Sequence, residues 1–155
     1  MKRIIILLLG LLVTGFVSAQ VDFSGKWKLN ASKSQLGEQF SMSPKEVIVS
    51  QSGGVMNVEK HSEFQGQQMT TNAKYTLDGK ECVNPGFQDS QNKSTALWSD
   101  DKKSLKITTK IPMGGGGDEL TFVEVYSIAG ENMTIKLNSS SSFGDMSETA
   151  VYDKE

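Results

Sequence analysis

Cysteine and histidine are scarce in this 155-residue chain, and each scarcity excludes a class of site. The single cysteine, Cys82, cannot form an internal disulfide, so stability has to come from packing. No histidine lies near it, and we interpret it as a half-buried, inert thiol rather than a nucleophile. His61, the only histidine, would have to complete any hydrolase triad by itself. The sequence therefore predicts a protein that is not an enzyme and has no cofactor.

A metal site is also poorly supported. Glu59 and Glu63 are the only ligands that the strand around His61 offers, and all three share one face. A solvated strand face explains this pattern more simply. The run Gly114 to Gly117 resembles a phosphate-binding loop only in composition, because no lysine and hydroxyl residue follow it and a strand comes next. We expect no metal site, and a flexible hairpin tip at the glycines.

A strong charge of one sign is lacking too. The chain has 16 basic and 18 acidic residues, for a formal charge of −2. Such a chain has no basic surface for nucleic acid or for an anionic membrane. Beyond its first residues it also has no apolar run near the roughly 20 residues that span a bilayer. We expect a soluble protein without a nucleic-acid partner and without stable membrane insertion.

The first residues have the pattern of an export signal. Lys2 and Arg3 form a basic start, Ile4 to Val13 an apolar run, and Val17-Ser18-Ala19 a small-residue cleavage site. We therefore expect residues 1–19 to be a cleaved signal peptide and residues 20–155 to form one domain. The mature protein would be periplasmic or secreted.

Most of the remaining chain alternates apolar and polar residues with a period of two, which is typical of half-buried strands. Turn signals such as Ser52-Gly53-Gly54 and Asp78-Gly79 separate nine or ten such segments. Asn30 to Pro44 is a long irregular connection with one helical turn near Lys33 to Leu36, and a serine-rich tract, Ser139 to Ser142, precedes the last strand. Sequential hairpins favour an up-and-down meander, and closure hides its edges. The sequence predicts an all-β fold, a single antiparallel β-barrel of 8–10 strands.

Several segments in order resemble secreted lipocalin-like proteins of bacteria, within the calycin group of β-barrels. They are Asp22 to Asn30, Ser32-Lys33-Ser34, Tyr75 to Glu81 and Val151 to Lys154. In lipocalins a Gly-x-Trp strand closes the base of the barrel, and the tryptophan packs under a basic residue near the C-terminus. Gly25 and Trp27 match this motif. No arginine occurs after Arg3, and Lys154 is the nearest substitute.

The resemblance and the barrel together predict a non-catalytic carrier or sensor of a small, largely apolar ligand. Large inward-facing side chains either fill the barrel or line a pocket. The candidate ligand-binding residues are Tyr75, Trp98, Phe122, Tyr126, Met69 and Met133. Trp27 is expected to plug the base instead. The alternative function is that of a solid-core envelope or secreted protein that acts through protein contacts of its loops.

Overall fold

The computed structural model describes residues 19–86, 89–113, 119–142 and 144–155. The signal peptide expected over residues 1–19, except Ala19, and the glycine tip lie outside these ranges. No helix in the described part of the chain has the length and apolarity needed to cross a bilayer.

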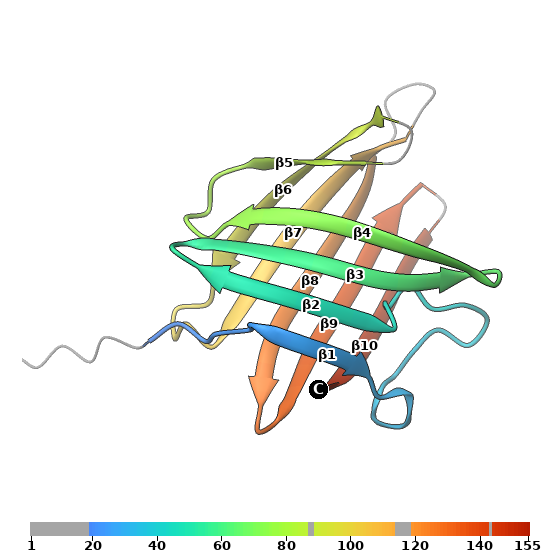
Figure 1. Cartoon of the computed structure of the whole chain (residues 1–155). Coiled ribbons are helices and arrows are strands. Elements are labelled where there is room, and N and C mark those ends of the chain that lie inside the picture. Colours follow the sequence, from blue (N-terminus) through green and yellow to red (C-terminus); the bar gives the residue numbers. More distant parts are fainter. Residues whose placement is uncertain (1–18, 87–88, 114–118, 143) are drawn as a thin grey trace, which may run out of the picture.

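The elements assigned within the described ranges are ten strands and the 3₁₀ helix η1 (Figure 1). They are β1 (Gly25–Leu29), η1 (Ala31–Lys33), β2 (Glu46–Ser52), β3 (Val55–Phe64), β4 (Gln67–Thr76), β5 (Cys82–Pro85), β6 (Gln91–Trp98), β7 (Ser104–Pro112), β8 (Glu119–Ala129), β9 (Asn132–Ser141) and β10 (Gly144–Lys154). Turns with glycine in the left-handed region join several of them, as at Gly66 and Gly79, both with φ of 79°.

The strands form one antiparallel meander in the order β4-β3-β2-β1-β10-β9-β8-β7-β6-β5. Strands adjacent in sequence pair with one another except β4 and β5, and β1 joins the two ends of the chain by also pairing with β10. Strands β1 to β4 lie in front of β6 to β10 and cross them at a steep angle (Figure 1). The prediction of an all-β, antiparallel up-and-down barrel is confirmed, with ten strands.

The two end strands, β4 and β5, meet without a backbone ladder. The Asn84 side chain replaces the missing ladder. Its amide oxygen accepts from Lys74 N at 2.7 Å, and its amide nitrogen donates to Lys74 O at 3.1 Å. Asn84 is buried, so these bonds are shielded from water. The barrel is therefore nearly closed, with a side chain in place of one strand pair.

Trp27 is part of the buried core, and its role as the plug of the barrel base stays a prediction. It is 2% exposed, and its indole N–H donates to Phe23 O at 2.9 Å. Lys154 Nζ lies 5.3 Å from the ring centroid, in cation–π range. Gly25 has φ of +145°, and a Cβ there would come within 2.9 Å of Lys154 Cε. The lysine side chain could move to relieve this contact, so it is the positive φ that favours glycine at this position.

Two local expectations differ from the structure. The serine-rich tract does not interrupt the sheet: β9 continues through Ser139 and Ser140 to Ser141, which pair with β10 and, up to Ser140, with β8. Ser139 is only 8% exposed, because two long neighbours hold the segment extended. The helical turn begins earlier than expected, at Ala31, because the Asn30 side chain caps it by accepting from Lys33 N.

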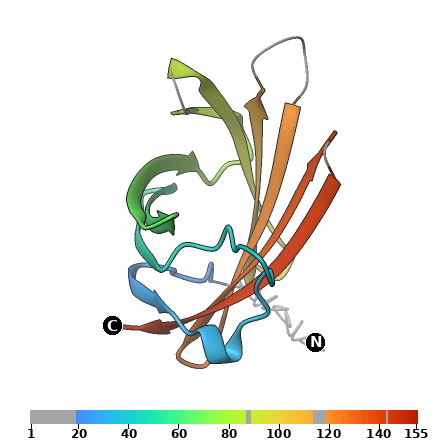
Figure 2. The same cartoon turned by 90° about the vertical axis from the view of Figure 1, so that its right-hand side faces the viewer.

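The long connection after η1 crosses the side of the barrel between the front strands and β10 (Figure 2). Gln35 forms an isolated β-bridge with Thr149 of β10. The connection is thus a packed surface loop rather than a free one, as its length led us to expect.

Candidate functional site

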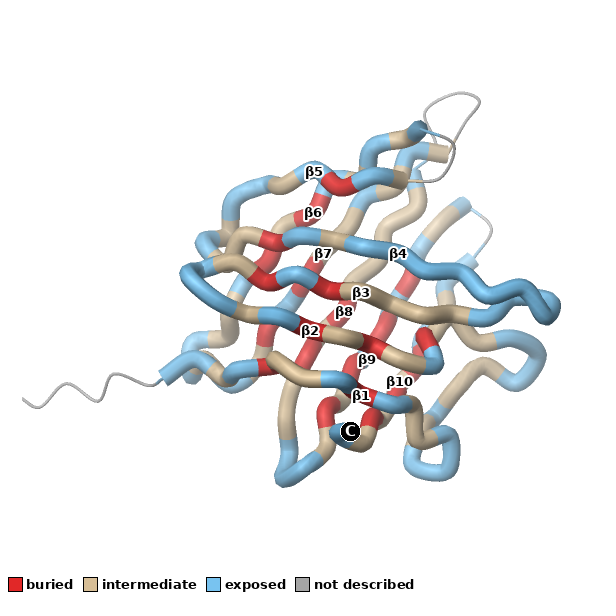
Figure 3. The backbone as a smooth tube through the Cα atoms, in the orientation of Figure 1, coloured by how far each residue is buried: buried red, intermediate tan, exposed pale blue. Residues whose placement is uncertain are grey.

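The barrel interior is filled at one end and becomes progressively exposed toward the other. Along the inner face of β3, Met56 and Val58 are buried, Lys60 and Ser62 are half-buried, and Phe64 is 56% exposed. Figure 3 shows the same trend, with buried positions on the middle of the strands and exposed positions at the tip of the β3–β4 hairpin. The closed end is a solid core, and the other end is open.

The back wall follows the same gradient in rows set by the strand register. One row contains Ala96, Ile107, Glu124, Leu137 and Glu148, which are cross-strand partners and all buried. The next row toward the open end contains Ser94, Thr109, Phe122, Ser139 and Met146. In that second row Thr109, Phe122 and Met146 are only half-buried. We call these five residues the upper row.

An ion pair crosses the interior at the border between the two rows. Lys60 Nζ of β3 lies 2.5 Å from Glu124 Oε1 of β8, with side chains 18% and 10% exposed. Burial alone would lower the pKa of Lys60, but the nearby Glu124 carboxylate outweighs it and raises this pKa. Lys60 therefore stays charged at neutral pH, and its ion pair with Glu124 forms a polar floor under the open half.

Three tyrosines lie beneath this floor. Burial raises the pKa of Tyr75, Tyr126 and Tyr152 above the usual range, so all three are neutral hydrogen-bonding groups. The Tyr152 hydroxyl donates to Pro44 O at 3.1 Å. The Tyr126 hydroxyl is buried close to the Glu124 carboxylate, without a hydrogen bond of good geometry among the described residues.

Glu148 fastens the loop to the barrel. Its Oε1 accepts from the backbone N–H groups of Gly37 and Met42, at 3.1 and 3.3 Å. Its Oε2 accepts from Ser41 Oγ, Ser43 N and Ser43 Oγ, at 2.9, 3.1 and 2.6 Å. Burial would raise the pKa of Glu148, but these donors hold it below the usual range. Both oxygens of this carboxylate thus accept hydrogen bonds from the loop.

The structure separates the six predicted ligand-binding residues. Tyr75, Tyr126 and Met133 belong to the solid core. Trp98 stacks on Phe23, with ring centroids 6.0 Å apart, and its buried indole N–H has no partner among the described residues. Phe122 is part of the upper row. Met69 is 47% exposed near the tip of the β3–β4 hairpin. Their role in binding stays a prediction.

Sequence reasoning missed Lys60 and Glu124, although a signal for both exists. Lys60 is in phase with Met56 and Val58, and Glu124 is in phase with Phe122 and Tyr126. A charged residue on the apolar face of a strand is either an edge feature or a buried partner of an opposite charge. Finding two such residues on different strands would have suggested the pair.

The side chains around His61 form an exposed surface network. His61 Nε2 lies 2.6 Å from Glu59 Oε1 and 3.9 Å from Glu46 Oε1, while Glu63 pairs with Lys45. Within the described ranges no group of three or more His, Cys, Asp or Glu residues is arranged to hold a metal ion.

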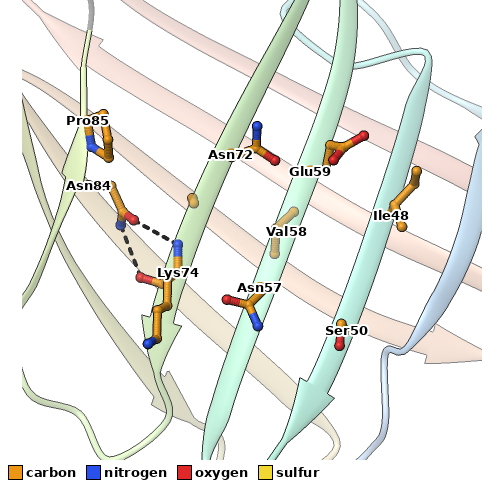
Figure 4. A pocket seen from close by; sticks show the side chains of 10 residues that line it. Ile48, Ser50, Asn57, Val58, Glu59, Asn72, Lys74, Asn84 and Pro85 are labelled. Atoms are coloured by element: carbon orange, nitrogen blue, oxygen red, sulfur yellow. Dashed lines mark hydrogen bonds between the residues drawn. The ribbon is translucent and has the colours of Figure 1, made fainter.

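Two hollows lie on the outer surface of the barrel rather than inside it. The first, about 400 Å³, spreads over the outer face of β2 to β4 and the Asn84 seam (Figure 4). The second, about 360 Å³, lies over β8 to β10 and includes Asn138 and Asp145. Asn57, Glu59 and Asn72 in the first hollow point away from the core (Figure 4). Neither hollow contains the polar floor.

No family model matches the chain, and a search of curated proteins finds no significant match. Solved structures do match. The zebrafish ileal bile acid-binding protein, in complex with cholic acid, gives a TM-score of 0.57 at 14% identity, covering 86% of this chain and 98% of that one. A luciferase domain from the dinoflagellate Lingulodinium polyedrum gives 0.52 at 8% identity, covering 84% and 42%.

A third match is secretory abundant heat soluble protein 4 from Ramazzottius varieornatus, with a TM-score of 0.49 at 15% identity, covering 85% and 94%. Identities this low bear on the fold alone. One matched structure is a binding protein and another a luciferase domain, so the fold does not decide between binding and catalysis. Together with the strand order, the bile acid-binding protein confirms the predicted fold: this chain forms a calycin-type antiparallel β-barrel.

Proposed function

We propose that this protein is a non-catalytic binding protein for a small, largely apolar molecule, held in the open half of the barrel. One observation carries the proposal: the interior is solid at the closed end, whereas Thr109, Phe122 and Met146 of the upper row are only half-buried. The likeness to a bile acid-binding protein supports it by analogy of fold.

The chemistry of the open half suits such a ligand. Phe122 and Met146 provide an aromatic and a soft thioether surface, and Leu137 lies directly below them. Ser94 and Thr109, whose hydroxyls are 2.9 Å apart, add a polar edge. Apolar walls with a few fixed polar groups are the usual lining of a small-molecule site.

Native mass spectrometry of the purified full-length product, followed by organic extraction, tests the proposal directly. We expect a co-purified small molecule, or saturable binding of the neutral dye Nile red. Ser139→Trp should fill the open half and abolish binding, because Ser139 faces the interior from the upper row. Asn138→Trp is the matched control, because Asn138 precedes it on the outer face and is exposed. Equal binding by both variants would contradict the proposed site.

The loops support a second candidate function, in contacts with another protein. Phe40 in the long loop is 54% exposed and Phe64 at the hairpin tip is 56% exposed. Large apolar side chains on loops of a rigid scaffold are suited to recognition. A stoichiometric protein partner captured from the exporting cell, lost in Phe40→Ser, with no co-purified small molecule, would favour this candidate.

Export is part of the proposal. The basic start, apolar run and Ala19 cleavage site support delivery to the periplasm or the medium. Cell fractionation and N-terminal sequencing test it: we expect a soluble product that begins at Gln20. Retention of the full N-terminus in the cytoplasm would contradict it.

A further inference from the structure

Resting on the proposed binding site, we infer that its ligand has an uncharged polar end, such as a hydroxyl or amide, and that the site discriminates against carboxylates. The argument starts from the charges that already lie beside the open half. They are the Lys60–Glu124 pair at the floor and the Glu148 carboxylate two strands further along the same row.

The only cation at the floor is already neutralised. Lys60 Nζ contacts Glu124 at 2.5 Å, and both side chains are largely buried. The charge of Glu148 is met by neutral donors of the loop and not by a second cation. Among the described residues, the layer formed by Lys60, Glu124 and Glu148 thus has one positive and two negative charges.

A ligand carboxylate would bring a third negative charge into this layer. It would lose its hydration, and the field that it meets is repulsive. It could accept one of the remaining Lys60 N–H groups, but only beside the Glu124 carboxylate, so that two like charges would share one largely buried cation. Anionic ligands therefore face a penalty that neutral ones do not.

An uncharged polar end can use the pair as it stands. The Lys60 ammonium has three N–H donors, and Glu124 holds one of them through Oε1, which leaves donors on the lysine and Oε2 on the glutamate. A ligand hydroxyl or amide can accept from the first and donate to the second.

The test compares two ligands with the same chain, dodecanol and dodecanoate, in displacement of Nile red at neutral pH. We expect dodecanol to bind about tenfold or more tightly than dodecanoate, since unpaired buried charge is strongly penalised. Tighter binding of dodecanoate would overturn the inference while leaving the proposed function intact. Failure of Nile red and both ligands to bind a folded protein would instead contradict the proposed function.

Glu124→Gln tests the cause of the selectivity. This substitution leaves Lys60 as an unpaired cation at the floor, so dodecanoate should gain about tenfold or more in affinity. Glu59→Gln is the matched control, because it removes the same charge next to Lys60 on the outer face. An equal gain in both variants would overturn the inference, since it would reflect net charge alone. Should Glu124→Gln fail to fold, the wild-type comparison of dodecanol with dodecanoate still decides.

Discussion

At the scale of single residues, we expect Trp27 to be a structural residue rather than a ligand contact. Its ring is buried, its indole N–H donates to Phe23 O, and Lys154 Nζ lies over the ring. A large aromatic at such a position contributes by packing and by excluding water from the core. Removal of this ring should therefore lower the stability of the fold without changing ligand binding.

Trp27→Ala should lower the free energy of unfolding by about 3–5 kcal/mol, because it leaves a large cavity at the end of the barrel. Urea denaturation followed by circular dichroism measures this difference. Leu97→Ala is the control, because Leu97 is 50% exposed, and a surface change of this kind should stay within about 0.5 kcal/mol. A Trp27→Ala protein as stable as the control would show that the end plug is dispensable.

The Lys60–Glu124 pair should behave as a buried ion pair. Lys60→Met leaves the Glu124 carboxylate unpaired and should cost about 3–5 kcal/mol of stability, whereas adding Glu124→Leu should restore most of that loss. Urea denaturation of wild type, single and double variants gives the coupling energy. A double variant whose loss of stability equals the sum of the losses in Lys60→Met and Glu124→Leu would indicate that the two side chains contribute independently.

At the scale of elements, the loop after η1 depends on one residue of β10. Five donors of residues 37–43 converge on the two carboxylate oxygens of Glu148. An amide in the same place has one acceptor oxygen, and its N–H₂ would face donors. The loop therefore requires a carboxylate at this position, and an ionised one.

Glu148→Gln should cost about 1–3 kcal/mol at neutral pH, and the cost should depend on pH. The pKa of Glu148 is lowered in the folded protein relative to its ordinary value of 4.5. The charge therefore contributes stability above about pH 4.5, and this contribution is lost as the pH falls through the lower folded pKa. Urea denaturation from pH 7 to pH 3 should show the difference between wild type and variant shrinking below about pH 4.5.

The control for this pH dependence is Glu131→Gln, at the exposed β8–β9 turn. It should differ little from wild type at any pH, since exposed charges contribute little. A difference for Glu148→Gln that is the same at pH 3 and pH 7 would show that ionisation of this carboxylate does not hold the loop.

The strands could be predicted from the sequence, but the floor of the site could not. The alternation of apolar and polar residues, as around Met56 and Val58 on β3, is a local pattern. It can therefore be recognised even when the rest of the fold is predicted wrongly. The meeting of Lys60 with Glu124, 64 residues apart, depends on closure of the barrel. The end of β9 was missed for a similar reason, because Ser139 and Ser140 are extended by their neighbours and not by their own propensity.

At the scale of the whole molecule, closure depends on a seam between β4 and β5. Backbone pairing continues around the barrel from β4 to β5 by way of β1 and β10, but the two end strands are joined at Asn84 only through its side chain. Unpaired strand edges are otherwise prone to open or to pair with other chains. The Asn84 side chain thus makes the hydrogen bonds to Lys74 that the backbone of a neighbouring strand would otherwise make.

Asn84→Ala should open this seam, because it removes a donor and an acceptor that no other described residue supplies to Lys74 on that side. We expect a loss of about 1–3 kcal/mol and faster hydrogen exchange of the Lys74 amide, which donates to Asn84 Oδ1. Asn57→Ala is the matched control, because Asn57 lies in the same outer hollow on β3 but is exposed and points to solvent (Figure 4). If exchange at Lys74 were unchanged in Asn84→Ala, the barrel would be held closed by packing of β4 against β5, and the side-chain bridge would be secondary.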